Sequence, residues 1–308
     1  MPESASHKSV KPLIGPAGFW PVDRLLLSAL AALSVVAAAR YPHPLKFLGV
    51  FGALALFIYA SARFGPRSRV GDVLHSFAPL VVIIAIFETV GFLVGAANPA
   101  RWDRTFSALD VKLFGSLLPA WRNAFGRPPW LTDLLSIAYM AYYVVPAIMG
   151  VALYLRQRRE EFDRFVFGLQ ATFICSYVFY FLFPTSGPRI PLAEAKQILG
   201  GGAVSELVRL FLDNCELNNF DAFPSGHTAI AVVFLAYGWN FLPRWRIPLA
   251  ITVSGIIFST VYLAHHYIVD LLAGALLALG MLWCMPYLQR VFGFTSRPWV
   301  RSEEGIPS

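Results

Sequence analysis

Eight long runs of apolar residues constrain the fold more than any other feature of this sequence. A helix needs about 20 apolar residues to cross a bilayer, and each run, with its flanking residues, comes close to that length. Hydrophobic residues make up 57% of the chain and charged residues only 14%. These proportions exclude an ordinary soluble domain and predict an all-α polytopic membrane helix bundle. The predicted spans cover residues 25–39, 45–62, 77–97, 134–155, 165–183, 228–242, 247–264 and 268–288.

The segments outside these spans divide the chain into one membrane domain and two polar tails. We expect a polar N-terminal tail over residues 1–20, a single transmembrane domain over 21–290 and a polar C-terminal tail over 291–308. Within the domain, residues 98–131 mix charges with apolar positions that recur at helical spacing from Phe106 to Phe114. This pattern is typical of a short helix at the membrane interface. Residues 190–222 are predicted to form a polar loop on the non-cytoplasmic side.

The distribution of basic residues predicts the orientation of the bundle. With eight spans, 15 of the 25 Lys and Arg residues fall on the side that holds both termini, and 10 fall on the other side, mostly in two long loops. Because cytoplasmic segments carry the excess of Lys and Arg, both termini are expected in the cytoplasm. The net charge of +7 comes from clusters between apolar runs, which favours membrane topology over nucleic-acid binding. The Ala-rich spans favour a bacterial plasma membrane.

Three polar motifs stand at the ends of predicted spans. They are FPTSGPR at residues 183–189, FPSGHT at 223–228 and HHYIVD at 265–270. Counting the spans places all three motifs on the non-cytoplasmic face. Histidine and aspartate are costly in a membrane setting, so their convergence on one face indicates a candidate active site.

The HHYIVD motif places a histidine and a carboxylate on one side of a helix. His266 and Asp270 are four residues apart, which is the spacing of neighbours on a helix surface. A carboxylate there can accept the imidazole N–H, fix the tautomer and raise the basicity of the other ring nitrogen. A histidine oriented in this way can act as a nucleophile. The alternative is a simple helix cap at the interface, which a lone pair of this kind supports about equally well.

The other two motifs contain groups that suit a phosphate. Pro224 is favourable in a first helical turn and Ser225 can cap that turn, so a helix starting there points its free N–H groups and positive dipole end outward. His227 lies within the turn. Arg189 supplies a planar guanidinium that makes paired bonds to phosphate. Taken singly, each motif also fits an ordinary helix start or an arginine at the lipid headgroups.

Together, the arginine, PSGH and HYxxD in this order resemble the phosphatidic acid phosphatase type 2 superfamily. The resemblance covers residues 183–274 in motifs and the last six spans in hydropathy, so the first two spans would be additions to a six-helix core. It implies that His266 is a nucleophile that forms a phosphohistidine, that Asp270 orients it and that His227 protonates the leaving alcohol. It further implies phosphate binding by Arg189, Ser225 and Gly226. No metal or other cofactor is implied.

Two positions depart from the usual motifs of that family. Leu182 stands where the first motif usually has a lysine, and Thr260 stands where the third usually has an arginine. Loss of positive charge weakens stabilisation of charge on phosphoryl oxygens. The stretches YFLFPTSGPR and TVYLAHHYIVD resemble an inositol-phosphorylceramide-synthase-like branch, in which an alcohol can replace water as the acceptor.

The leading hypothesis is an integral-membrane lipid phosphatase or phosphotransferase, a hydrolase or transferase of lipid metabolism that works without a metal at the non-cytoplasmic face. Its partners would be a lipid phosphate, water or an alcohol, and the surrounding lipids. The alternative is a catalytically inactive relative that transports or binds a lipid or an anion. The residues leave open which lipid is used, whether water or an alcohol accepts the phosphoryl group, the oligomeric state, and the roles of Glu88 and His265.

Overall fold

The regular structure of the described chain consists of helices. The computed structural model describes residues 18–116, 120, 124, 126, 128–189, 199–215 and 220–294, and no strand occurs in these ranges. Most of both predicted polar tails lies outside them. The elements in chain order are α1 (Pro21–Arg40), α2 (Leu45–Phe64), η1 (Gly65–Arg67), α3 (Arg69–Ala97), α4 (Asp103–Phe114), α6 (Pro129–Leu155), α7 (Arg159–Leu182), α9 (Ala203–Cys215), α10 (Gly226–Phe241), η2 (Pro243–Trp245), α11 (Arg246–Tyr262) and α12 (Ile268–Val291).

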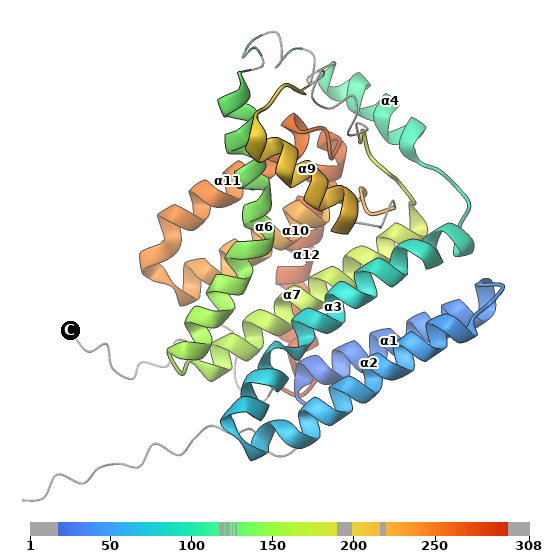
Figure 1. Ribbon diagram of the computed structural model, residues 1–308, viewed down its shortest axis with the longest axis vertical. Coiled ribbons are helices and arrows are strands. Elements are labelled where there is room, and N and C mark those ends of the chain that lie inside the picture. The colour runs from blue at the N-terminus through green and yellow to red at the C-terminus, as the bar shows by residue number, and fades with distance from the viewer. Residues whose placement is uncertain are drawn as a thin grey trace, which may run out of the picture.

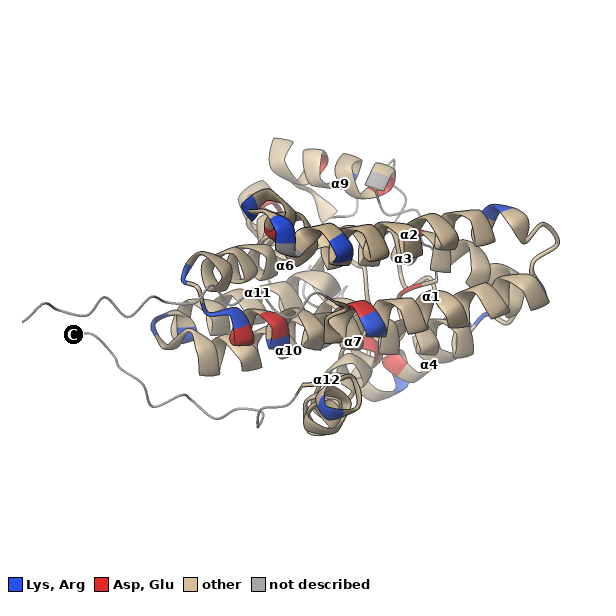
Figure 2. Ribbon diagram, turned by 90° about the horizontal axis from the view of Figure 1, so that it is seen from below, with Lys and Arg blue, Asp and Glu red and all other residues tan. Residues whose placement is uncertain are grey.

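Seven of these helices are long and apolar enough to cross a membrane, which makes the chain an integral membrane protein. They are α1, α2, α3, α6, α7, α12 and the continuous η2–α11 segment. Figure 2 shows their ribbons as mostly uncharged, with scattered basic and acidic positions. The sixth predicted span forms α10, which has 16 residues and therefore a length of about 24 Å. Most of its residues are buried, and it contacts α7, α11 and α12. The predicted all-α polytopic bundle is confirmed, with one short helix among its members.

Several helices begin before the apolar run that predicted them. Helix α3 starts at Arg69 instead of residue 77, because the Ser68 hydroxyl caps it by accepting a hydrogen bond from the Gly71 N–H at 3.0 Å. Asp72 in its first turn is favourable at the positive end of the helix dipole. Helix α7 likewise starts at Arg159 with two glutamates in its first turn. Hydropathy alone does not register these polar turns.

The two N-terminal helices pack as a pair against α3 and α7 (Figure 1). Asp23 of α1 and His75 of α3 form a fully buried contact of 2.8 Å between Oδ2 and Nε2. The Trp20 ring stacks on His75 with 3.6 Å between centroids. This polar contact ties the N-terminal pair to the start of α3, at the opposite end of the bundle from the three motifs.

Two shorter helices, α4 and α9, lie toward the top of Figure 1. Helix α4 contains the predicted helix from Phe106 to Phe114 and begins slightly earlier. Helix α9 lies within the segment predicted as a loop. Its apolar positions recur at helical spacing, which the loop prediction overlooked; they are Val204, Leu207, Val208, Phe211 and Leu212. Residues 190–198 and 216–219 of that segment lie outside the described ranges.

Candidate active site

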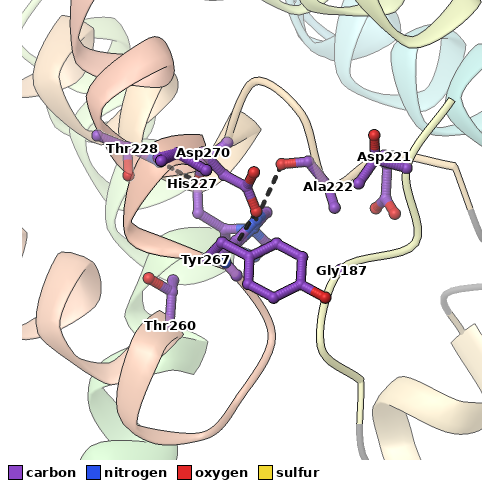
Figure 3. Close-up of polar contacts among 12 residues, drawn as sticks. Gly187, Asp221, Ala222, His227, Thr228, Thr260, Tyr267 and Asp270 are labelled. Carbon is purple, nitrogen blue, oxygen red and sulfur yellow. Dashed lines mark hydrogen bonds and ion pairs between the residues drawn. The ribbon is translucent and has the colours of Figure 1, made fainter. Parts of the chain in front are cut away.

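The starts of α10 and α12 meet closely and bring the second and third motifs together. The Ser225 N–H donates to the Asp270 carbonyl at 2.9 Å. Gly274 of α12 allows this approach, because a Cβ there would lie 2.4 Å from the Ser225 carbonyl oxygen and 3.1 Å from the Thr228 Cβ. The start of α10, which carries His227, and the segment just before α12, which carries His266, therefore form one site (Figure 3).

The two predicted histidines are in contact and buried. The Nε2 atom of His266 lies 3.3 Å from Nδ1 of His227. The Nδ1 atom of His266 lies 3.0 Å from the carbonyl oxygen of Ala222. Because a carbonyl can only accept, this contact assigns the proton of His266 to Nδ1 and leaves a lone pair on Nε2, facing His227. This is the tautomer expected of His266, and its role as a nucleophile stays a prediction.

Two acceptors face Nδ1 of His266. The predicted one, Oδ2 of Asp270, lies 3.5 Å away, and the Ala222 carbonyl is closer, at 3.0 Å. Oδ2 also accepts the Tyr267 N–H at 2.8 Å and caps the start of α12. Asp270 is completely buried, and its role in orienting His266 stays a prediction. Figure 3 shows Asp270, Ala222 and Tyr267 around this point.

The start of α10 has the capped form that the sequence predicted. The Ser225 hydroxyl accepts the Thr228 N–H at 3.2 Å. A Cβ on Gly226 would lie 2.7 Å from the Tyr180 hydroxyl, so this tyrosine of α7 reaches the same turn. The His227 ring lies between Tyr139 and Tyr142 of α6, at centroid distances of 4.6 and 4.2 Å. The tyrosine cluster of α6 thus forms one wall of the site.

The first motif lies beside the other two. Gly187 has a φ of +77°, and a Cβ there would lie 2.6 Å from the His265 carbonyl oxygen and 3.1 Å from the Ala222 Cβ. Only glycine therefore fits this turn. The Ala222 N–H donates to the Thr185 carbonyl at 3.0 Å, which joins the loop to the segment before α10.

Arg189 follows this turn and is already paired with a carboxylate. Its guanidinium forms a hydrogen-bonded ion pair with Asp221, which lies next to Ala222. Arg189 is 30% exposed, so it remains accessible to a ligand. Sequence reasoning missed Asp221; its position shortly before the predicted helix start was the one available signal.

His265, although adjacent to His266, has different surroundings. Its ring stacks on Tyr139 at a centroid distance of 4.5 Å. Burial lowers the pKa of His265 to about 3, and the charges of His266, Arg189 and Arg209 act in the same direction. His265 is therefore neutral at physiological pH, and its stacking on Tyr139 makes it a packing residue beside the site.

Leu182 and Thr260 occupy the positions where the family motifs usually have a lysine and an arginine, and neither side chain carries a charge. Leu182 ends α7 and is 53% exposed. Thr260 is buried, and its hydroxyl donates to the Ile257 carbonyl of its own helix at 2.8 Å. The Thr260 carbonyl accepts the N–H groups of both His265 and His266, at 2.9 and 3.2 Å. Glu88 lies within α3, a helix that contributes none of the motif residues.

Comparison with known proteins defines the class of this membrane protein. A family profile described as the PAP2 superfamily matches residues 104–284. This match covers more than half of the chain, including nearly all of α4, the three motifs and most of α12, so the chain belongs to the PAP2 superfamily. No solved structure matches the chain.

The curated relatives support a particular branch of that superfamily. The inositol phosphorylceramide synthase of Candida albicans is 33% identical over 91% of this chain and 58% of its own length. The phosphoinositol dihydroceramide synthase of Bacteroides thetaiotaomicron is 28% identical over 51% of this chain and 57% of its own. A PA-phosphatase related-family protein of Dictyostelium discoideum is 22% identical over 80% and 52%, respectively. The chain thus spans little more than half of these relatives' lengths and resembles the inositol phosphorylceramide synthase-like branch.

Proposed function

We propose that this chain is a lipid phosphotransferase that works through a phosphohistidine on His266. The observation that carries the proposal is the orientation of the His266 ring. Its Nδ1 donates to the Ala222 carbonyl, and its Nε2 faces Nδ1 of His227 at 3.3 Å. A nucleophile and a second imidazole in contact form the pair that covalent phosphoryl transfer requires.

The first half of the reaction breaks the bond between phosphorus and the donor lipid. Nε2 of His266 attacks phosphorus, while His227, protonated once the anionic phosphate is bound beside it, gives its proton to the leaving oxygen. The buried carboxylate of Asp270, 3.5 Å from Nδ1, stabilises the positive charge that develops on the imidazole. In the second half, neutral His227 takes the proton of the acceptor hydroxyl, the hydroxyl oxygen attacks phosphorus, and the N–P bond breaks to regenerate His266. The proposed steps use no metal.

The phosphate would be held by the start of α10 and by Arg189. The first turn of a helix presents N–H groups and a positive dipole end. Ser225 uses its hydroxyl to cap Thr228, so we assign the backbone N–H groups of Gly226 and His227 to the phosphate oxygens. Arg189 would exchange part of its contact with Asp221 for the phosphate. This exchange offers one compensation for the cations absent at residues 182 and 260.

The names of the relatives favour transfer to an alcohol over hydrolysis. Two of them are synthases whose names describe a ceramide or dihydroceramide joined to a phosphoinositol group. We therefore propose that the donor is a phospholipid with a polyol headgroup and that the acceptor is a lipid hydroxyl. We further propose that the site faces the non-cytoplasmic side of a bacterial plasma membrane, with both termini in the cytoplasm, as the distribution of basic residues predicts.

A product assay on the purified protein tests this proposal. The protein would be mixed with a panel of phospholipid donors, with and without lipid alcohols and with and without inositol or glycerol. When a lipid alcohol is present, the proposal predicts that the main product is that alcohol joined to the phosphate and polyol headgroup of the donor. Release of free phosphate from a lipid monoester, unchanged by any alcohol, would favour a phosphatase instead. Absence of turnover with every donor would support the alternative of an inactive binding protein.

A further inference from the structure

Helix α4 lies against all three motifs, although it contains none of them. Asp103, Ser107 and Asp110 follow each other at spacings of four and three residues, so they lie on one face of this helix. On the same side, Phe106 is buried and stacks on Phe223, with ring centroids 3.9 Å apart. Phe223 is the first residue of the FPSGHT motif.

The first carboxylate on this face holds the loop that leads to Arg189. One oxygen of Asp103, Oδ1, accepts the N–H of Ser186 at 2.8 Å and the N–H of Gly187 at 3.0 Å. Two consecutive backbone donors bound to one carboxylate fix the direction of the chain at this turn. Arg189 follows two residues later, so the contacts with α4 fix the position of the backbone from which the Arg189 side chain extends.

The second carboxylate holds the start of α12. Asp110 Oδ1 accepts the N–H of Val269 at 2.9 Å. Val269 lies in the first turn of α12, whose N–H groups have no partner within the helix, and a negative charge there is favourable. One turn earlier on α4, the Ser107 side chain lies close to the Tyr267 side chain. These contacts flank the segment from His266 to Asp270.

We propose that α4 sets the geometry of the site, with Asp110 positioning His266 and Asp103 positioning Arg189. Both aspartates are positioning residues, because they contact backbone groups of the motifs. The inference rests on the proposed function, since it assigns a purpose to geometry around His266 and Arg189. It adds that the loop before Arg189 and the start of α12 are held by different ends of α4. Removing the Asp103 contacts and removing the Asp110 contact should therefore have different kinetic effects.

The test compares Asp110→Ala and Asp103→Ala in steady-state kinetics. Asp110→Ala frees the start of α12, so kcat should fall by about 10- to 100-fold while KM for the phospholipid donor changes by less than about threefold. Asp103→Ala frees the loop before Arg189, so KM for the donor should rise by about fivefold or more with a smaller change in kcat. Asp110→Asn and Asp103→Asn keep a carbonyl oxygen acceptor and should recover most of each loss.

A matched control comes from an exposed position of the same helix. Val111 is 54% exposed, and Val111→Ala should behave as the wild type. The inference is overturned if both alanine variants match Val111→Ala. It is also overturned if both alanine variants lower kcat and raise KM in the same proportion and melt at the same reduced temperature, and if the asparagine variants recover neither the kinetics nor the melting temperature.

The His266→Ala variant in the same assay distinguishes a failure of the proposed function from a failure of this inference. Full activity of that variant contradicts the proposed function, whereas normal kinetics of the α4 variants contradicts this inference alone.

Discussion

At the scale of single residues, two adjacent histidines have sharply different environments. His266 has one ring nitrogen on a backbone carbonyl and the other facing His227. His265 lies against Tyr139 and does not share that arrangement. The four-residue spacing from His266 to Asp270 distinguished the two in the sequence. The structure corrects the helix assignment, because α12 begins at Ile268 and His266 lies just before it, so the two residues do not share a helix face. The backbone carbonyl of Ala222 could not be found from the sequence, because it depends on how the segment before α10 folds over α12.

The lowered pKa of His265 predicts how stability responds to acid. Its pKa falls from an ordinary value of about 6.5 to about 3 on folding. Between these values the folded histidine is neutral and the unfolded one is protonated, so unfolding takes up a proton. Stability should therefore be highest above pH 6.5 and should fall as the pH drops, by at most about 1.4 kcal/mol per pH unit from this group.

Thermal melting in detergent at pH 7.5 and pH 5 measures this effect. The melting temperature of the wild type should fall between the two values, and that of His265→Gln should fall less, because glutamine takes up no proton. Equal falls in the two proteins would contradict a His265 that is neutral in the folded protein.

At the scale of helices, the site depends on how closely α10 and α12 approach each other. Gly274 lies where a Cβ would be 2.4 Å from the Ser225 carbonyl, whereas Gly280 on the same helix has open space around its Cβ position. The backbone of α10 cannot yield as a flexible side chain would. An added methyl group at residue 274 must therefore separate the two helix starts or move one of them.

Gly274→Ala and Gly280→Ala form a matched pair for this contact. We expect Gly274→Ala to destabilise the protein by about 1–3 kcal/mol and to reduce activity by at least about tenfold. Gly280→Ala should leave activity unchanged and can raise stability slightly, because alanine favours a helix interior over glycine. Melting curves and turnover of both variants provide the measurement. The helix contact is misassigned if the two substitutions behave alike.

Sequence patterns predicted most of the helices and the order of the site residues, but not the contacts between them. Apolar runs identified the spans because lipid requires helices with satisfied backbones. They placed helix starts too late where a capped polar turn such as that at Ser68 precedes the run. The predicted roles of Arg189, Ser225, Gly226, His227, His266 and Asp270 stay predictions that the geometry makes testable. Asp103, Asp110 and Asp221 were missed because each acts through a residue distant in sequence.

At the scale of the whole molecule, polar groups gather at opposite ends of an apolar bundle. The three motifs lie at one end. The other end holds the buried contact between Asp23 and His75, and Arg159 there pairs with Asp72 and Asp163 at 3.4 and 3.2 Å. The division into one transmembrane domain with two polar tails stays a prediction. An apolar middle with two polar ends fits a protein fixed across a bilayer, so each end has a definite side.

Two cysteine substitutions test which end faces outward. Lys112 on α4 and Arg67 in η1 are both exposed and lie at opposite ends of the bundle. In intact cells, a membrane-impermeant maleimide should label Lys112→Cys, and it should label Arg67→Cys only after the membrane is opened. The reverse pattern would place the candidate site in the cytoplasm and contradict the proposed orientation.

The central claim is that His266 becomes covalently phosphorylated, and direct trapping of that intermediate is its most direct test. Purified protein would be mixed briefly with a phospholipid donor that carries radiolabelled phosphate, quenched in alkali and separated from lipid. Phosphohistidine survives alkali and breaks down in acid, which distinguishes it from a phosphoserine. We expect label on the wild type and on His265→Gln, and none on His266→Ala. Label on His266→Ala, or an active wild type that never carries label, would contradict the account.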